Sequence, residues 1–120
     1  MAAPYADFYL LPLKKRLLPK YKRIAQGAGK IWRKHGALEY REFVADDLSA
    51  KWGTWPMGKV MKVRKGEVLI GSIVGYKSRK HRDATNAKIM ADPAMSELMP
   101  EMIFEMKRMT VGGFKGLVDV

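Results

Sequence analysis

A strand-like run from Glu67 to Tyr76 constrains the fold of this chain more than any other stretch. Its apolar side chains fall on both sides of an extended backbone: Val68, Ile70, Val74 and Tyr76 on one side, Leu69 and Ile73 on the other, beside Gly71 and Gly75. A strand that is apolar on both sides is usually covered on both sides. Helices of the same chain can cover one side, but a chain of 120 residues has little left for a second layer. We therefore expect a second copy of the chain to cover the other side, and predict a homodimer.

Patterns elsewhere place this strand in a single α+β domain that spans residues 1–120. The predicted elements are a strand at 5–13, a helix at 17–35, strands at 37–44 and 67–76, a helix at 79–91 and a strand at 107–118. Ser78 is a suitable N-cap for the second helix, and Met95 and Met102 are expected to fill gaps in the core. A further short strand is predicted at 59–63, and a bulge or close backbone approach at Gly112-Gly113. The main order, βαββαβ, is the ferredoxin-like arrangement with an antiparallel sheet.

The positive charge of the chain is concentrated in two segments. Of the net charge of +11, residues 1–35 contribute nine basic side chains and one acidic one, and residues 59–91 contribute nine and two. Such a field favours anionic partners, among them nucleic acid and phosphorylated or carboxylated small molecules. The alternative is that the basic residues form ordinary solvated helix faces.

Other features of the composition restrict the class of protein. The chain has no cysteine, which excludes disulfides and thiolate metal sites. No stretch approaches the ~20 apolar residues of a membrane span, and the amino-terminal residues do not resemble a signal peptide. We therefore expect a cytoplasmic protein that does not act at a membrane.

The junction between the central strand and the second helix, Tyr76 to Asp83, is crowded with basic side chains. Free N–H groups at a helix start attract anions, and guanidinium groups would strengthen that attraction. Ser78, Arg79 and Arg82 are therefore candidate ligands for a phosphate or carboxylate. The alternative is that these side chains extend into solvent or pair with acidic residues, because a helix start disfavours cations.

Three stretches carry a resemblance to a known family: Gly29 to Tyr40, Tyr76 to Pro93 with its Lys-Ser-Arg-x-His-Arg-Asp core, and Lys107 to Phe114. Together they resemble the DUF1428 family, small bacterial proteins that contain a domain of unknown function. The resemblance implies a dimeric α+β barrel, in which two ferredoxin-like chains pack their sheets face to face. It brings no established catalytic residues, and some family members carry a label that relates them to signal recognition particle RNA.

Three residues are candidates for catalysis: Asp7, His81 and Arg108. His81 can exchange a proton near neutral pH, and Asp7 lies on a strand that we expect to be covered, where a carboxylate often changes its pKa. Glu39 and Glu42 are further carboxylates of this kind; the alternative is that such carboxylates form intersubunit ion pairs with Arg41 or Arg108. With two histidines and no ligand spacing, we predict no metal site, and no cofactor.

Loop tryptophans complete the list of candidates. Trp55 could close a ligand pocket, as could Trp52, although ordinary packing within the loop is the simpler interpretation. The hypothesis that follows is a homodimer that binds a small anionic ligand near Glu39, Trp55 and the basic junction, and that could be a cofactor-free enzyme. The alternatives are a nucleic-acid-binding module and an interaction protein without a site. RNA recognition by the sheet face is disfavoured because the central strand has no aromatic residue before Tyr76.

Overall fold

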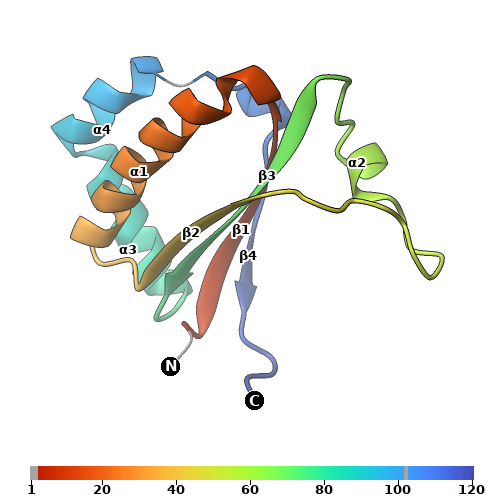
Figure 1. Ribbon diagram of the computed structural model, residues 1–120. Helices are drawn as coiled ribbons and strands as arrows, with labels where there is room; N and C mark the ends of the chain where they lie inside the picture. Colours follow the sequence, from red (N-terminus) through yellow and green to blue (C-terminus); the bar gives the residue numbers. More distant parts are fainter. Residues whose placement is uncertain (1–2, 102) are drawn as a thin grey trace.

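Four antiparallel strands form the centre of the molecule. The computed structural model describes residues 3–101 and 103–120. The strands are β1 (Tyr5–Lys14), β2 (Glu39–Val44), β3 (Glu67–Tyr76) and β4 (Thr110–Lys115), arranged in the order β2-β3-β1-β4 (Figure 1). The two long strands, β1 and β3, lie side by side in the middle and pair from Tyr5 with Tyr76 to Lys14 with Glu67. This topology confirms the predicted ferredoxin-like α+β fold.

All the longer helices lie on one face of the sheet (Figure 1). They are α1 (Leu18–Lys34), α3 (Arg79–Met90) and α4 (Pro93–Leu98); the short α2 (Met57–Val60) belongs to the loop on the other side of the sheet. Three short 3₁₀ segments complete the chain: η1 (Lys15–Leu17), η2 (Met99–Glu101) and η3 (Met106–Arg108).

Side chains near the helix ends explain where the helices begin and end. The Ser78 hydroxyl accepts a hydrogen bond from the backbone N–H of His81 at 3.0 Å, which confirms the predicted N-cap of α3. Asp92 caps α4 in the same way by accepting from the N–H of Ala94 at 2.9 Å. After α1 the chain turns at Gly36, whose φ of 108° is a conformation that favours glycine.

The core fills the space between the helices and the sheet. Near the end of β1, Leu11, Leu13 and Ile70 pack with residues of η1, α1 and the segment before β4. At the opposite end of the sheet, Val74 and Tyr76 pack with Ala37. Met95 packs between the helices, as predicted. Met102, which was expected to do the same, lies outside the described residues.

The other face of the sheet carries apolar side chains that the chain itself leaves accessible. Phe8, Phe43 and Phe114 are each about half exposed there, and Phe8 and Phe114 contact each other with ring centroids 5.0 Å apart. The guanidinium of Arg41 lies 4.8 Å from the Phe43 ring centroid. Although β3 has no aromatic residue before Tyr76, this face of the sheet does carry aromatic rings, because they come from the other three strands.

The structure corrects four expectations. Residues 59–63 do not form a strand; Pro56 precedes the short helix α2, and Lys62 turns the chain with a positive φ. The last strand is shorter than predicted at both ends: Lys107 and Arg108 belong to η3, and Tyr5, the first residue of β1, pairs with Lys115, beyond which β1 offers no partner. Pairing continues through Gly112-Gly113 without a bulge. Trp52 and Trp55 do not pack within their loop, since they are 95% and 86% exposed.

Candidate functional site

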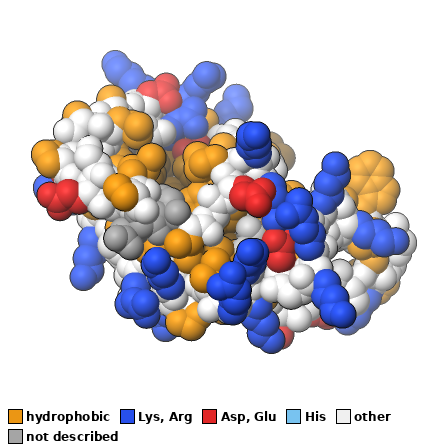
Figure 2. Space-filling view, turned by 90° about the horizontal axis from the view of Figure 1, so that it is seen from above, with side chains coloured by type: hydrophobic (Ala, Val, Ile, Leu, Met, Phe, Trp, Pro, Cys, Tyr) orange, Lys and Arg blue, Asp and Glu red, His pale blue; other side chains and the backbone are white. Residues whose placement is uncertain are grey.

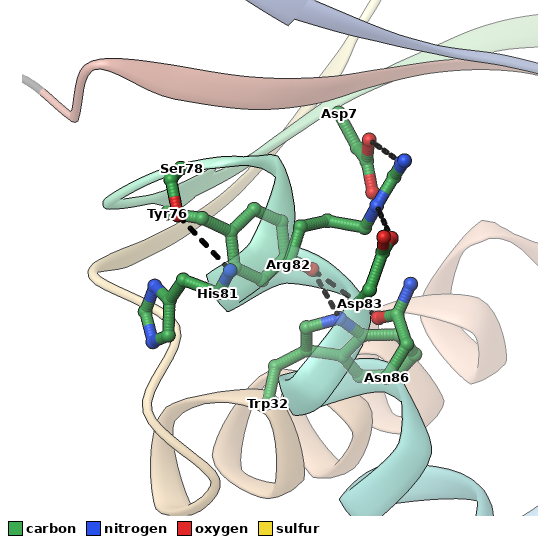
Figure 3. Close-up of polar contacts among 8 residues, drawn as sticks. All are labelled: Asp7, Trp32, Tyr76, Ser78, His81, Arg82, Asp83 and Asn86. Carbon is green, nitrogen blue, oxygen red and sulfur yellow. Dashed lines mark hydrogen bonds and ion pairs between the residues drawn. The ribbon is translucent and has the colours of Figure 1, made fainter.

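The basic junction at the start of α3 is held together by contacts within the chain (Figure 3). Ser78 caps the helix, and the Nδ1 atom of His81 accepts a hydrogen bond from the backbone N–H of Lys77 at 2.9 Å. The His81 ring also contacts the Tyr76 ring edge to face, with centroids 5.8 Å apart. Ser78 and His81 thus fix the path of the backbone from β3 into α3, while the side chain of Arg79 is exposed.

Arg82 reaches from α3 to the sheet and binds the carboxylate of Asp7 on β1 (Figure 3). Its Nη1 atom lies 2.7 Å from Asp7 Oδ1, and its Nε atom lies 2.7 Å from Asp83 Oδ1. Asp7 is only 1% exposed. Burial raises the pKa of Asp7 above its ordinary value, although the charge and hydrogen bond of Arg82 act to lower it. The guanidinium that was expected to bind an external anion therefore binds an internal one.

A glycine on the neighbouring strand makes this ion pair possible. Gly113 of β4 is the partner of Asp7 in the sheet. A Cβ atom at Gly113 would collide with the Tyr5 hydroxyl and would lie 3.1 Å from Arg82 Nη1. The guanidinium also lies over the Tyr5 ring, 5.4 Å from its centroid. A close backbone approach was predicted at Gly112-Gly113; in the structure, the groups that lie close to Gly113 are the side chains of Tyr5 and Arg82.

Trp32 and Tyr76 continue the polar layer beneath α3 (Figure 3). The indole N–H of Trp32 donates to the Tyr76 hydroxyl at 3.0 Å, and that hydroxyl lies 3.5 Å from Asn86 Oδ1. Burial raises the pKa of Tyr76 well above its ordinary value. At this end of the molecule, the Asp7 carboxylate, the Arg82 guanidinium and the Tyr76 hydroxyl thus have partners within the chain, whereas the buried Thr85 hydroxyl of α3 has none among the described residues.

The remaining predicted site residues lie elsewhere. Arg108 binds Glu67 at the opposite end of the sheet, with Nη1 to Oε2 at 2.6 Å and Nη2 to Oε1 at 2.7 Å. Glu39 lies on the open face beside Gly75, and Trp55 extends from the loop on that side. The structure therefore brings Asp7 and Arg82 together. It does not bring Asp7, His81 and Arg108 into one site.

A separate groove runs between α1 and the edge strand β2. Its volume is about 1000 Å³, which is in the range of small-molecule sites. Apolar walls come from Leu18, Ala25, Val44 and Ile70. Lys22, Lys30 and Arg33 also line it, and Arg33 donates from Nη1 to the carbonyl oxygens of Ala37 and Leu38.

Glu42 places a carboxylate in this groove, where three hydroxyl groups donate to it. Tyr21 donates to Oε1 at 2.5 Å, Tyr40 to Oε2 at 2.5 Å and Ser72 to Oε1 at 2.9 Å. The donors come from α1, β2 and β3, so this Glu42 cluster (Tyr21, Tyr40, Glu42 and Ser72) ties three elements together. Both tyrosines have pKa values raised by burial and, next, by the charge of Glu42, which keeps them protonated donors.

Local sequence explains how the cluster is assembled. Ser72 is the cross-strand partner of Glu42 in the pairing of β2 with β3, so both side chains lie on the helix-covered face. Gly29 lets α1 approach the Tyr40 ring, because a Cβ atom there would lie 2.8 Å from that ring. From the sequence, Glu42 was expected as a carboxylate on a covered strand, with an intersubunit ion pair to Arg41 or Arg108 as the alternative. Tyr21, which recurs at helical spacing with Leu18 and Ile24, was a signal that could have indicated a hydrogen-bond partner for Glu42.

Tyr9 lies on the same face as both carboxylates. It is the β1 partner of Ser72 and stands two residues from Asp7. Burial raises the pKa of Tyr9 to about 12, and the nearby charge of Asp7 acts in the same direction. The helix-covered face thus holds carboxylate and phenol groups in one layer. The phenols of Tyr21 and Tyr40 donate to Glu42, and the remaining oxygen lone pairs can accept from a ligand hydroxyl.

Surface charge is widely spread. Viewed from above, Lys and Arg side chains lie over much of the molecule and outnumber the acidic ones (Figure 2). Within residues 3–101 and 103–120, no three His, Asp or Glu side chains are grouped so that they could hold a metal ion. In that same part of the chain, no helix is both long enough and apolar enough to cross a membrane.

The fold defines the class of protein, an α+β protein with a ferredoxin-like antiparallel sheet. Within that class the chain belongs to the DUF1428 family, described as a protein of unknown function, whose model matches residues 4–106. It is 32% identical over 121 residues to the uncharacterized protein YbaA of Escherichia coli strain K12, covering 96% of this chain and 97% of YbaA. The predicted family is confirmed.

Solved structures share the fold at low sequence identity. Protein Atu4242 of Agrobacterium tumefaciens is 19% identical with a TM-score of 0.59, covering 94% of this chain and 93% of that one. A NIPSNAP domain protein of Burkholderia xenovorans is 14% identical with a TM-score of 0.58, covering 94% of each chain. SnoaB, a cofactor-independent oxygenase of Streptomyces nogalater, is 7% identical with a TM-score of 0.50, covering 98% of each chain. Likeness at this level concerns the fold, and function depends on the site.

Proposed function

We propose that this protein binds a small organic anion in the groove between α1 and β2, with the Glu42 cluster as its recognition centre. The observation that carries the proposal is the environment of the Glu42 carboxylate. It accepts three hydroxyl hydrogen bonds beside a groove large enough for a ligand. Half-buried polar groups of this kind, converging on a largely apolar groove, are typical of binding sites for small molecules.

The composition of the groove suggests the chemistry of the ligand. Leu18, Val44 and Ile70 fit an apolar body, such as an aromatic ring or a short acyl chain. Lys22 and Lys30 favour a carboxylate or sulfonate on that body. A ligand hydroxyl can donate to a remaining lone pair of the Glu42 carboxylate or to the phenol oxygen of Tyr40, whose own proton is donated to Glu42.

The same proposal includes a homodimer formed through the open sheet face. Phe8, Phe43 and Phe114 leave an apolar surface there, and contiguous apolar surface of this kind commonly marks an interface between proteins. A second copy of the chain would cover it with matching aromatics, as expected from the two-sided strands. Sedimentation analysis that found only monomers at micromolar concentrations, or RNA bound to this face of a monomer, would contradict the dimer.

The groove is tested with a probe of matching chemistry, 1-anilinonaphthalene-8-sulfonate, which combines an apolar body with one sulfonate. We expect Ala25→Trp, which fills the groove, to weaken probe binding by about tenfold or more, because one blocked apolar site removes ~1.4 kcal/mol or more. Lys30→Gln should weaken it less, by removing one rim charge. Binding is measured by fluorescence titration, with folding checked by circular dichroism.

A matched control separates the groove from the open face. Phe114→Ser changes an exposed aromatic on the other side of the sheet and should leave the groove-bound fraction of the probe unchanged. If Phe114→Ser removed probe binding while Ala25→Trp and Lys30→Gln did not, the groove would not be the site.

A further inference from the structure

A second concave site lies at the end of the sheet where β1 finishes and β3 begins. Five basic side chains surround it: Lys14, Lys15 and Arg16 at the β1–η1 junction, and Arg64 and Lys65 in the turn before β3. This basic cleft has a volume of about 660 Å³. All five side chains are exposed. Figure 2 looks down on this end of the molecule, where Lys and Arg side chains outnumber acidic ones.

Within the described part of the chain, no acidic side chain that lines the basic cleft pairs with its five basic side chains. Glu67 is the acidic residue among the lining residues, and both of its carboxylate oxygens are bound by Arg108. That hydrogen bonding holds the pKa of Glu67 down to about 2, so it remains ionised but already paired. Five cations around one small cleft repel one another, and the repulsion is relieved when a multivalent anion enters.

One backbone hydrogen bond joins the two sides of the cleft, and two hydrogen bonds that involve side chains hold the turn before β3. The N–H of Lys15 donates to the carbonyl of Gly66 at 2.9 Å, which joins η1 to the turn. The N–H of Arg64 donates to Glu67 Oε1 at 2.8 Å. Arg108 adds a hydrogen bond from Nη2 to the carbonyl of Lys62 at 3.0 Å. The basic side chains therefore extend from an ordered frame, which reduces the entropy lost on binding.

We propose that the basic cleft binds a small ligand with two or three adjacent phosphate groups, such as an oligophosphate or the phosphate chain of a nucleotide. The guanidinium groups of Arg16 and Arg64 can each hold two oxygens of one phosphate. The ammonium groups of Lys14, Lys15 and Lys65 supply point charges for neighbouring phosphates. A compact ring of cations around a cleft fits a short, dense anion better than an extended nucleic-acid backbone, which is followed by a longer basic groove. This site is independent of the groove beside Glu42.

The test is calorimetric titration with inorganic tripolyphosphate at ~100 mM salt, where diffuse surface attraction is largely screened. We expect the double variant Lys15→Gln/Lys65→Gln to bind at least about tenfold more weakly than the natural chain, because two charge-assisted contacts are lost. The control, Lys88→Gln/Lys115→Gln, removes the same charge from exposed positions on α3 and β4 and should bind as the natural chain does. Arg16→Gln/Arg64→Gln repeats the test if the first variant fails to fold.

Three results would overturn the proposal. The first is equal weakening in the cleft and control variants, which would mean that net charge alone attracts the anion. The second is the absence of measurable tripolyphosphate binding to the natural chain. The third is a macromolecular ligand: a single-stranded RNA, or vesicles containing phosphatidylglycerol, that displaces tripolyphosphate at equal phosphate concentration and depends on the same two lysines.

Discussion

Two arginine–carboxylate pairs join the sheet to the rest of the chain at its opposite ends, and their physical states differ. Arg82 makes one hydrogen bond to Asp7 at 2.7 Å, and burial raises the pKa of that carboxyl above its ordinary value. Arg108 binds Glu67 through two parallel hydrogen bonds, and the pKa of Glu67 falls to about 2. The residue types are almost the same, but the pKa shifts have opposite signs.

Geometry and burial account for the difference. The Glu67 carboxylate also accepts from the backbone N–H of Arg64, so its charged form is hydrogen-bonded on both oxygens, which favours ionisation. Asp7 lies beneath α3, where removal from water disfavours the charged carboxylate. The attraction of the Arg82 guanidinium offsets only part of this effect. The comparison shows that an arginine partner can favour the charged form of a carboxylate, as at Glu67, or can offset only part of the cost of burying that charge, as at Asp7.

The largest expected effect comes from removing the arginine of the buried pair. Arg82→Met should lower the free energy of unfolding by about 3 kcal/mol, because it leaves Asp7 buried without a cation. Urea unfolding at neutral pH measures the change. The double variant Asp7→Leu/Arg82→Met serves as the control and should recover most of the loss, because no unpaired charge remains. A double variant as unstable as Arg82→Met alone would mean that packing, and not charge, explains the effect.

A smaller effect is expected at the glycine that makes room for the buried pair. Gly113→Ala should cost about 2 kcal/mol of unfolding free energy, since the added Cβ collides with Tyr5 and crowds Arg82. Gly112→Ala, at the neighbouring position, is the control. Its added Cβ would contact only the Phe114 ring, at 3.3 Å, so the loss of unfolding free energy should be smaller. Thermal unfolding compares the two. Equal losses would contradict the tight packing inferred around Arg82.

The smallest and most specific effect concerns how the free energy of unfolding depends on pH, because Glu67 and Asp7 should contribute to it in opposite directions. The folded pKa of Glu67 is lowered, so its contribution to stability is present above its unfolded pKa of 4.5 and is lost as pH falls toward about 2. The folded pKa of Asp7 is raised above 3.8, so its contribution is greatest below 3.8 and declines as pH rises above that value.

Two neutral variants separate these contributions. Compared with the natural chain, Glu67→Gln should lose less stability on acidification. The advantage of the natural chain over Asp7→Asn should shrink as pH rises. Urea unfolding from about pH 2 to about pH 7 measures both. Curves that run parallel to that of the natural chain would contradict the assigned pKa directions.

Much of the architecture could be predicted because it depends on local patterns. Alternating apolar residues located β3, and the hydroxyl of Ser78 marked the start of α3. The loop from residue 45 to residue 66 was harder, because its short run at 59–63 contains two β-branched valines, Val60 and Val63, a residue type common in strands. In the structure no neighbouring strand pairs with them, and the backbone forms α2 instead.

The candidate site was predictable only in part. Glu42 was selected as a carboxylate on a strand expected to be covered. Its three hydrogen-bond donors, Tyr21, Tyr40 and Ser72, come from three elements and converge only when the sheet and α1 are packed. Asp7 and Arg82 were both selected, yet as members of different sites. A one-residue change in the register of β1 would have turned Asp7 away from Arg82.

By itself, the sequence determined the order of the strands and helices, the family and the strongly basic character of this chain. These properties follow from periodicity, capping residues and composition, which act over a few neighbouring residues. The tertiary structure decided which charges are used internally and which remain available. It joined Arg82 to Asp7 and Arg108 to Glu67, and it left the groove beside Glu42 and the basic cleft accessible on the surface. Such pairings depend on distances between residues far apart in the chain, which only packing sets.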